Sequence, residues 1–500
     1  MKKTAIQNSL VSLICQVIIV VLAMVIPRLV MINYGSDTNG LTNAVTQIYT
    51  YMALLAAGIG QATQNALYNY LSDEDRHGIS RIMSIARRYY RKISTIYAVT
   101  VLIVSALLPF VFKTEVSGWV VSLYVIFGGA TSLISFYFTS LWTVFLNANG
   151  KSYITNLISL LGKVLLYAVI IVLSLGKVNI AIIQIGCFLV ALIPLAFYCF
   201  YIKRHYSWID YRSADVNDIL PDRKAYVITE VAWTVFSSSD MIILSIAVST
   251  KMASVYATYN MIFVALETML NGVYYSVKYL LGITYHDKRE EYEKLHDTFN
   301  SVFVGSSVAL LSVCYLLIIP FIKIYTRGVT DINYIWAWLP LGFCLVKLLS
   351  RSRMVAGNLT GIAGYARQVS YVSLLEAVIN IALSVILVGK FGIYGVLYAT
   401  VIALLVKLIY VNYLADRKIL NRKAFGTVIL LSGNYIVFAV TVFLQYIKPI
   451  EVQNYLEFLL YGIGLMGIYA VIVFVMNVLV NKSFRGYAIS IMKKITASRA

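Results

Sequence analysis

The chain has 500 residues, of which 60% are hydrophobic and only 13% are charged. A soluble globular protein is about a quarter charged and less than half apolar, so this composition excludes a water-soluble fold and predicts an integral membrane protein. The formal net charge of +19 does not indicate nucleic-acid binding, because the basic residues lie between hydrophobic stretches and form no domain of their own.

About fourteen stretches along the chain are long and apolar enough to cross some 30 Å of hydrocarbon as helices. In the first half we expect them at 8–33, 40–64, 89–111, 119–146, 154–175 and 178–202. In the second half we expect them at 225–248, 253–283, 298–324, 333–355, 365–388 and 391–413, followed by a pair at 427–447 and 455–480. The first is too long for the apolar part of a signal peptide and lacks a small-residue cleavage site, which favours a retained span.

The distribution of Lys and Arg between the spans predicts the orientation. The face that holds both termini carries 29 of them, and the opposite face carries seven. By the positive-inside rule, both termini lie in the cytoplasm. The outward loops are expected to be no longer than about ten residues, which leaves no room for an extracytoplasmic catalytic domain.

A weak internal repeat has an offset of about 214 residues, the length of six spans with their loops. Ser159-Leu160-Leu161 aligns with Ser373-Leu374-Leu375 in this frame. Because six is even, both repeats enter the membrane in the same direction. We therefore predict an N-lobe (1–203, helices 1–6), a cytoplasmic connector (204–224), a C-lobe (225–413, helices 7–12), an extra helix pair (427–480) and a basic cytoplasmic tail (481–500).

Neither the cysteines nor the histidines have the spacing of a metal site or a disulfide framework. The cysteines are unpaired in spacing and fall in apolar spans, and the histidines fall in predicted loops, where we expect solvated surface residues. They are Cys15, Cys187, Cys199, Cys314 and Cys344, and His77, His205, His286 and His296.

Several ionisable side chains fall at membrane depth, where facing lipid would cost about 2.5 to 3.5 kcal/mol each, so we expect them inside the bundle. The basic ones are Arg28, Lys163, Lys278, Lys347 and Lys407, with Arg351 and Arg353 at the cytoplasmic end of the tenth span; the acidic ones are Glu230, Asp240, Glu267 and Glu376. The first six spans contain no acid at this depth. Cations in both lobes favour an anionic substrate, and phosphate oxygens suit Lys and Arg donors.

Helical spacing sorts these charges into polar stripes that should line a central cavity. Glu267, Asn271, Tyr274 and Lys278 share one face of the eighth span; Glu230, Thr234, Ser237 and Asp240 share one face of the seventh; and Lys347 and Arg351 are four apart on the tenth. The alternative is that such charges pair into structural locks, or that Lys278 and Lys407 extend to the headgroups, which is the interpretation we favour for Lys407.

The predicted substrate-binding cations are therefore Lys278, Lys347 and Arg351, while Arg28, which follows Pro27, is either a further cavity cation or a structural charge. Asp240, Glu267 and Glu376 either bind a coupling proton or sodium ion or neutralise these cations when the cavity is empty. No catalytic residue, metal site or cofactor is predicted.

The order of short motifs resembles the polysaccharide transporter, or Wzx-type flippase, family of the multidrug/oligosaccharidyl-lipid/polysaccharide (MOP) superfamily. The first lobe contributes Asn8-Ser9, Pro27-Arg28, Tyr34-Gly35, Gly40, Ala57-Gly58-Ile59 and Leu67-Tyr68, and the second contributes Ser239-Asp240, Ile243-Leu244, Val255-Tyr256-Ala257 and Tyr259-Asn260. The resemblance covers essentially the whole chain, and the family's cavity cations correspond by position to Arg28, Lys278 and Lys347.

The resemblance implies a flippase, not an enzyme, that moves undecaprenyl-diphosphate-linked oligosaccharides across the bacterial cytoplasmic membrane by alternating access, for surface polysaccharide biosynthesis. Its partners would be the lipid-linked glycan, membrane lipids and other polysaccharide-assembly proteins, with no nucleic acid. The alternative is a multidrug antiporter of the same superfamily, which exports organic cations and needs acidic residues in its cavity. A membrane enzyme that joins glycans would need a large outward loop with paired charges, which the sequence does not predict.

Overall fold

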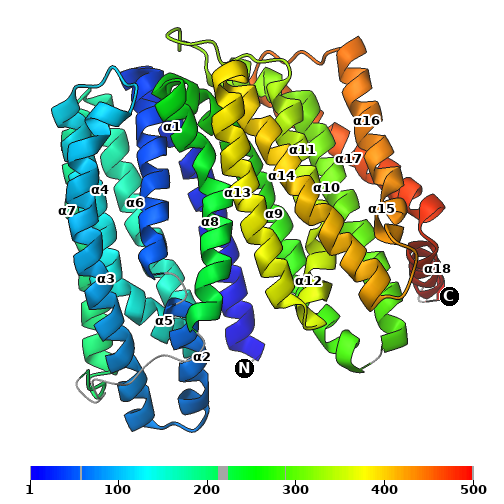
Figure 1. Ribbon diagram of the computed structural model, residues 1–500, viewed down its shortest axis with the longest axis horizontal. Helices are drawn as coiled ribbons and strands as arrows, with labels where there is room; N and C mark the ends of the chain where they lie inside the picture. The colour runs from blue at the N-terminus through cyan, green and yellow to red at the C-terminus, as the bar shows by residue number, and fades with distance from the viewer. Residues whose placement is uncertain (1, 57–58, 212–222, 288, 498–500) are drawn as a thin grey trace. The chain divides into compact units, whose positions relative to one another are not determined.

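The computed structural model describes residues 2–56, 59–211, 223–287 and 289–497 (Figure 1). Helices and short turns make up these residues, and no strand occurs among them. Within this described part, eight helices are long and apolar enough to span a membrane, and residues 234–247 and 432–447 form shorter apolar helices. The prediction of an all-α multi-pass membrane protein is confirmed.

The chain divides into two compact units, Met1–Val255 and Tyr256–Ala500. The helices of the first unit are α1 (Lys2–Ala53), α2 (Ile59–Ser72), α3 (Arg76–Val111), α4 (Gly118–Ile134), α5 (Ser140–Ala148), α6 (Ser152–Leu175), α7 (Ile180–His205) and α8 (Arg223–Ala247). A 3-10 turn, Leu54–Ala56, follows α1, and a π-helical turn, Ser135–Thr139, joins α4 to α5.

The second unit takes in most of α9 (Thr250–Asp287) and all later helices. These are α10 (Arg289–Tyr325), α11 (Leu339–Ser352), α12 (Met354–Ile362), α13 (Ala366–Phe391), α14 (Ile393–Tyr413), α15 (Gly426–Leu430), α16 (Ser432–Ile447), α17 (Tyr455–Val480) and α18 (Lys482–Ala497). A π-helical turn, Leu414–Ile419, extends α14.

The predicted repeat recurs in the bounds of the helices. Helix α5 ends at Ala148 and α12 at Ile362, while α6 begins at Ser152 and α13 at Ala366, so both pairs are 214 residues apart. The same span is also interrupted in both copies, by the π-helical turn that ends at Thr139 and by the break at position 353. The repeat seen in the sequence is therefore also present in the positions of these helices.

Helix α8, which the sequence assigns to the C-lobe, belongs to the first of the two compact units. It packs along α1, where the Tyr51 hydroxyl donates a hydrogen bond to the carbonyl oxygen of Val235 at 3.1 Å. The division into lobes stays a prediction.

The first two spans are joined without the loop that the sequence predicts at 34–39. Helix α1 contains both, and only Gly35 departs from helical geometry, with φ 84° and ψ 168°. Glycine reaches a positive φ at little cost, which explains how the chain changes direction at a single residue.

The tenth span begins later than predicted, at Leu339 instead of 333, because Asn333 organises the preceding chain into a turn. Its side-chain oxygen accepts the Ile335 amide at 2.8 Å, and its carbonyl accepts the Trp336 indole N–H at 2.8 Å. Pro340 then occupies the first turn of α11, where its missing N–H costs nothing. The connection 326–338 has thirteen residues, so the expected limit of about ten for outward loops is wrong.

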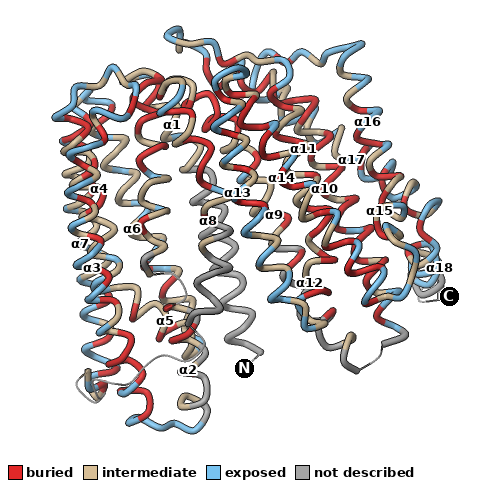
Figure 2. The backbone as a smooth tube through the Cα atoms, viewed as in Figure 1, coloured by how far each residue is buried: buried red, intermediate tan, exposed pale blue. Residues whose placement is uncertain are grey.

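Burial is concentrated in α10 (Figure 2). In its most apolar stretch 67% of residues are buried, against 17% for α17 and 11% for α6. Helix α10 is thus the centre of the second unit, whereas α6 and α17 present apolar side chains outward, as expected of helices that face lipid.

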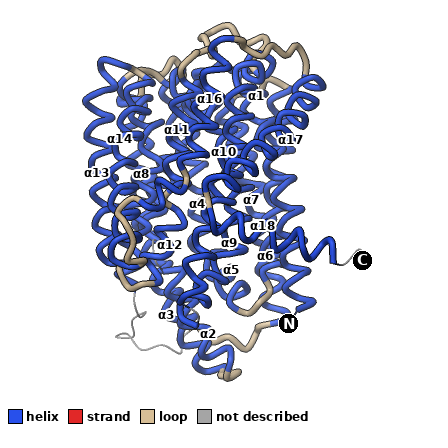
Figure 3. The backbone as a smooth tube through the Cα atoms, turned by 90° about the vertical axis from the view of Figure 1, so that its right-hand side faces the viewer, coloured by secondary structure: helices blue, strands red, loops and turns tan. Residues whose placement is uncertain are grey.

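The last helix follows α17 after a sharp corner and runs across its direction (Figure 3). Asn481 makes this corner: its side-chain oxygen accepts the backbone N–H groups of Ser483 and Phe484 at 2.9 and 3.1 Å, an N-cap geometry. Arg485 in turn donates to the carbonyl oxygens of Val478 and Leu479 at the end of α17.

Candidate functional site

A buried charge cluster joins α9 to α11 in the second unit. Lys347 Nζ lies 3.0 Å from Glu267 Oε2, and Arg351 Nη2 lies 2.5 Å from Glu267 Oε1. Arg351 Nη1 also donates to Asn271 Oδ1 at 2.6 Å. The structure therefore brings together the two polar stripes that helical spacing predicts on the eighth and tenth spans.

This cluster, which we call the first triad, has two cations and one carboxylate, a net charge of +1. The side chains of Lys347, Arg351 and Glu267 are 15%, 6% and 23% exposed. Within the described residues the Arg351 Nε–H is buried and has no acceptor. A buried donor without an acceptor is costly, and an anion would supply the acceptor that this N–H lacks. The guanidinium can therefore still bind an anion.

A second triad of the same composition lies on α13 and α14 and at the break between α11 and α12. Arg353 Nη1 contacts Glu376 Oε1, and Lys407 Nζ lies 3.8 Å from Glu376 Oε2. The side chain of Glu376 is only 3% exposed, so it is the buried counter-ion of two cations. The net charge is again +1.

Arg351 and Arg353 stand on either side of Ser352, at the break between α11 and α12. Arg351 contacts α9 and Arg353 contacts α13, so the two guanidinium groups extend from the break to different helices. A helix interrupted at membrane depth is tolerated where protein or a polar cavity satisfies the freed backbone groups, and such breaks are common at transporter binding sites.

The other predicted site residues are not part of these triads. Arg28 is half-buried on α1, and Asp240 is buried on α8 beside Tyr51 and Ser239. Both belong to the first unit. Lys278 and Glu230 have side chains outside the described part of the chain. Lys163, the other cation of the first six spans, is exposed on α6.

The stripe predicted on the seventh span is only partly buried. Thr234 and Asp240 are buried, but Ser237 between them is exposed. Helical spacing therefore places these residues near one another, but their side chains differ in burial.

Sequence analysis missed a buried carboxylate at the bend in α1. Asp37 is 6% exposed; its Oδ2 accepts the Thr114 hydroxyl at 2.6 Å and the Glu115 amide at 2.8 Å, and its Oδ1 accepts the Thr250 hydroxyl. Two residues further, Asn39 Nδ2 donates to Ser254 Oγ at 2.7 Å. The one available signal in the sequence was a single Asp two residues after Tyr34-Gly35.

These contacts join the α1 bend to the start of α9, where the two backbones approach closely. A Cβ on Gly40 would lie 1.6 Å from the carbonyl oxygen of Thr250. Lys113 Nζ donates to the Ala247 carbonyl oxygen at 2.8 Å, and Lys251 pairs with Glu115 at 2.7 Å. We call this set of contacts the α1–α9 contact.

The prediction that the histidines are solvated is wrong for His296. His77 and His205 are exposed, whereas the side chain of His296 is fully buried at the start of α10, with Nδ1 3.2 Å from Asp297 Oδ1. His286 has a side chain outside the described residues. Helical continuity explains the error: α10 begins nine residues before the predicted span and carries its polar first turns into the bundle.

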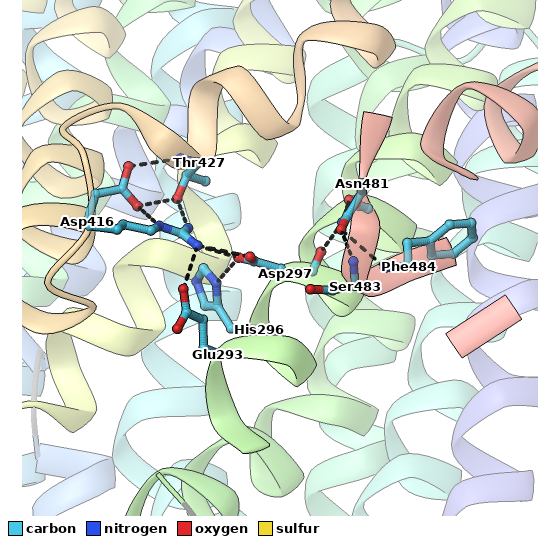
Figure 4. A network of polar contacts seen from close by, with 10 residues as sticks. Glu293, His296, Asp297, Asp416, Thr427, Asn481, Ser483 and Phe484 are labelled. Carbon is cyan, nitrogen blue, oxygen red and sulfur yellow. Dashed lines mark hydrogen bonds and ion pairs between the residues drawn. The ribbon is translucent and has the colours of Figure 1, made fainter. Parts of the chain in front are cut away.

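His296 belongs to a larger polar network around Arg422 (Figure 4). Arg422 binds Asp297 at 2.9 and 3.0 Å and Asp416 at 2.8 Å. No three His, Cys, Asp or Glu side chains within the described ranges form a metal-ligand group.

No family model matches the chain, and no curated protein matches its sequence. Solved structures do match. The lipid II flippase MurJ in an inward closed conformation has a TM-score of 0.69 at 14% identity, over 93% of this chain and 98% of that one. An inward-facing multidrug resistance MATE family transporter of the MOP superfamily has a TM-score of 0.63 at 13% identity, over 78% and 93%.

The MATE multidrug transporter DinF-BH, in complex with a ligand, is a third match, with a TM-score of 0.60 at 17% identity over 88% of this chain and 97% of that one. The chain therefore has the fold that MATE transporters share with MurJ. The MurJ match leaves only 7% of the 500 residues uncovered, fewer than the 75 residues from 426 onward, so it must include part of the last helices.

Proposed function

We propose that this protein is a flippase for a lipid-linked oligosaccharide, with a polyprenyl diphosphate as the group that it binds. The observation that carries the proposal is the first triad, in which Glu267 is shared by Lys347 and Arg351. Two cations for one carboxylate leave a positive charge inside an apolar bundle, which favours an anion over a cation as ligand.

A diphosphate suits this arrangement better than a single carboxylate does. Phosphate oxygens can accept from the Lys347 ammonium and from several guanidinium N–H groups of Arg351 at once, including the buried Nε–H. In the absence of substrate Glu267 holds the two cations in place, and the diphosphate would compete with it for them.

The structural similarities are compatible with this proposal. MurJ is by its name a lipid II flippase, and its match to this chain extends into the last helices. We infer that the glycan would cross the membrane by alternating access while the lipid tail stays in the bilayer, in the cytoplasmic membrane of a bacterium. Other polysaccharide-assembly proteins would act before and after it.

Coupling to an ion gradient belongs to the same proposal. Asp240 and Glu376 are buried carboxylates, one in each unit, and they are candidates for a proton or sodium ion. Glu267 and Glu376 are weaker candidates than Asp240, because each already pairs with two cations.

A multidrug antiporter is the second candidate. Buried Asp240 and Asp37 favour it, because organic cations need a carboxylate, and DinF-BH, which has the same fold, is described as a multidrug transporter. Since both carboxylates lie in the first unit, this function would use a site different from the triads.

The test is translocation of a fluorescent undecaprenyl-diphosphate oligosaccharide in vesicles that contain the purified protein. We expect wild type to move the lipid and the Lys347→Ala, Arg351→Ala double variant to lose at least about tenfold in rate, since each lost charge-assisted contact is worth about 1.5 kcal/mol or more.

The matched control is Arg417→Ala, Lys418→Ala, which removes the same charge from an exposed pair and should leave the rate unchanged. Transport of an organic-cation dye without movement of the lipid would refute the flippase and favour the antiporter. Unchanged lipid transport by the Lys347, Arg351 double variant would remove the first triad from the site.

A further inference from the structure

The network around Arg422 connects five parts of the second unit at one end of the bundle. Arg422, in the loop after α14, binds Asp297 of α10 and Asp416 of the π-helical turn, and its Nη2 donates to the Thr427 hydroxyl of α15 at 2.8 Å. The backbone carbonyl of Asp297 accepts from Asn481 Nδ2 at 3.0 Å, at the corner between α17 and α18 (Figure 4).

The fixed charges of this network do not balance. Asp297 and Asp416 contribute two negative charges, Arg422 contributes one positive charge, and the side chains of Asp297, Asp416 and Arg422 are 11%, 0% and 18% exposed. Glu293, whose Oε1 lies 3.5 Å from Arg422 Nη1, is 51% exposed, so water largely screens its charge and we leave it out of the buried charge. The buried part therefore has a net charge of −1, which is costly in an apolar environment unless a cation compensates it.

His296 is placed to supply that cation. It is fully buried, and its Nδ1 lies 3.2 Å from Asp297 Oδ1, so the ring directly contacts the carboxylate that Arg422 also binds. Histidine is the side chain whose protonation changes near neutral pH. One proton on this ring brings the four-group network of His296, Asp297, Arg422 and Asp416 to zero charge.

The surroundings of the second ring nitrogen are compatible with an added proton. Among the described residues, His296 Nε2 is buried without a hydrogen-bond partner, and so are both side-chain polar atoms of Asn300, one helical turn further along α10. A protonated ring presents an Nε2–H donor on the helix face that also carries an amide oxygen in need of a donor.

Among the side chains that the structure describes, the other cations on the elements that pack against α10 are engaged elsewhere or exposed. Lys347 and Arg351 of α11 bind Glu267, and Arg485 of α18 binds the carbonyl oxygens that end α17. Lys482 of α18 is exposed. Tyr292, one turn before His296, lies near its ring at 5.9 Å and carries no charge near neutral pH.

From this geometry we propose that His296 is a buried proton-binding site, and that its proton holds the start of α10 to the loop after α14 and to the α17–α18 corner. The ligand is a proton, taken up when the network closes and released when it opens. In this proposal Glu293, a half-exposed carboxylate three residues before His296 on α10, passes the proton to and from solvent.

The experiment is thermal unfolding of the full-length purified protein in detergent between about pH 6 and about pH 8, the range in which histidine titrates. A proton that binds only the folded network stabilises it, so the melting temperature of wild type should fall by several degrees as the pH rises. His296→Gln, which keeps a polar side chain but cannot take up the proton, should show no such fall.

Two further variants make the test specific. Asp297→Asn balances the remaining pair of Asp416 and Arg422, so it should also abolish the fall although His296 is present. His205→Gln is the matched control, because His205 is exposed and lies in the first unit, and it should keep the wild-type slope.

If either variant of the network fails to fold, the protonation of His296 can be measured in the wild-type protein alone. Nitrogen-15 NMR of labelled histidine should show one ring with both nitrogens protonated under conditions in which the exposed rings are neutral. A neutral His296 ring at about pH 7, or a wild-type slope in folded His296→Gln, would overturn the proposal. These readouts need no transport, so they stand or fall independently of the flippase function.

Discussion

At the scale of single residues, Asp37 is a buried carboxylate that joins three parts of the first unit. It accepts hydrogen bonds from the Thr114 hydroxyl and the adjacent Glu115 amide in one segment, and from the Thr250 hydroxyl in another. A carboxylate can accept several such bonds, and each is stronger than one between neutral groups. Asp37 thus holds the α1 bend, the loop after α3 and the start of α9 together.

We expect Asp37→Ala to lower the free energy of unfolding by about 2 to 4 kcal/mol, because it removes these bonds and leaves the Glu115 amide without its acceptor. Denaturant or thermal unfolding of the purified protein measures the loss.

The neighbouring ion pair provides the comparison for Asp37. Lys251 and Glu115 are 25% and 75% exposed, so Lys251→Ala should cost less than about 1 kcal/mol. Equal losses for the two variants would show that the α1–α9 contact does not depend on the buried carboxylate.

The first triad and the His296 network show which site residues a sequence can reveal. Glu267 with Asn271, and Lys347 with Arg351, are pairs four residues apart, and helical periodicity alone assigns each pair to one face. His296 and Arg422 are 126 residues apart in two segments that sequence analysis treats as loops. Periodicity within one helix cannot indicate which distant segment packs against it, so this network could not be predicted.

At the scale of secondary-structure elements, Glu376 links three helical segments through charge. It binds Arg353 closely and Lys407 more loosely, at 3.8 Å, and is itself only 3% exposed. The two cations are not equivalent: Arg353 is 8% exposed and Lys407 is 21% exposed. The contribution of each to stability should differ accordingly.

We expect Glu376→Gln to destabilise the protein by about 3 to 5 kcal/mol, because it leaves two buried cations without a carboxylate. Lys407→Gln should cost far less, since the Arg353–Glu376 pair that remains is neutral. Unfolding measurements on both variants test this order, and a greater loss for Lys407→Gln would contradict it.

The elements were predicted well where periodicity and length decide, and less well where local side chains decide. In the described part of the chain the expected spans fall on helices, although 40–64 and 119–146 each cover more than one, and the 214-residue offset recurs in the helix bounds. The late start of α11 depends on the bonds of Asn333, and its early end depends on a break between two arginines, which hydropathy does not detect. The bend in α1 depends on one glycine in a position that looked like a loop.

At the scale of the whole molecule, the final helix pair is fixed to α10 by polar contacts as well as by apolar packing. The Asn434 and Asn477 amides bond to each other in both directions at 3.0 Å, and Thr441 bonds to Tyr469 and to Ser312 of α10. A Cβ on Gly305 of α10 would lie 2.7 Å from Val473. Close approach and interhelical amides are typical of helices that associate inside a membrane.

The orientation of the whole molecule in the membrane decides which of its loops face the cytoplasm and which face outward. The excess of 29 over seven Lys and Arg predicts that the loop after α14, with Arg422, faces the cytoplasm, and that the α13–α14 turn faces outward. Helix α14 has 21 residues and is about 32 Å long, so Lys390 and Lys418 lie at opposite ends of the hairpin. Both side chains are exposed.

Single cysteines at these two positions test the orientation, in a background without the five native cysteines. In intact cells, a membrane-impermeant maleimide should label Lys390→Cys and not Lys418→Cys; after permeabilisation it should label both to a similar extent, because both sites are exposed. Labelling of Lys418→Cys in intact cells would invert the topology. His296 would then exchange protons with the outside instead of the cytoplasm.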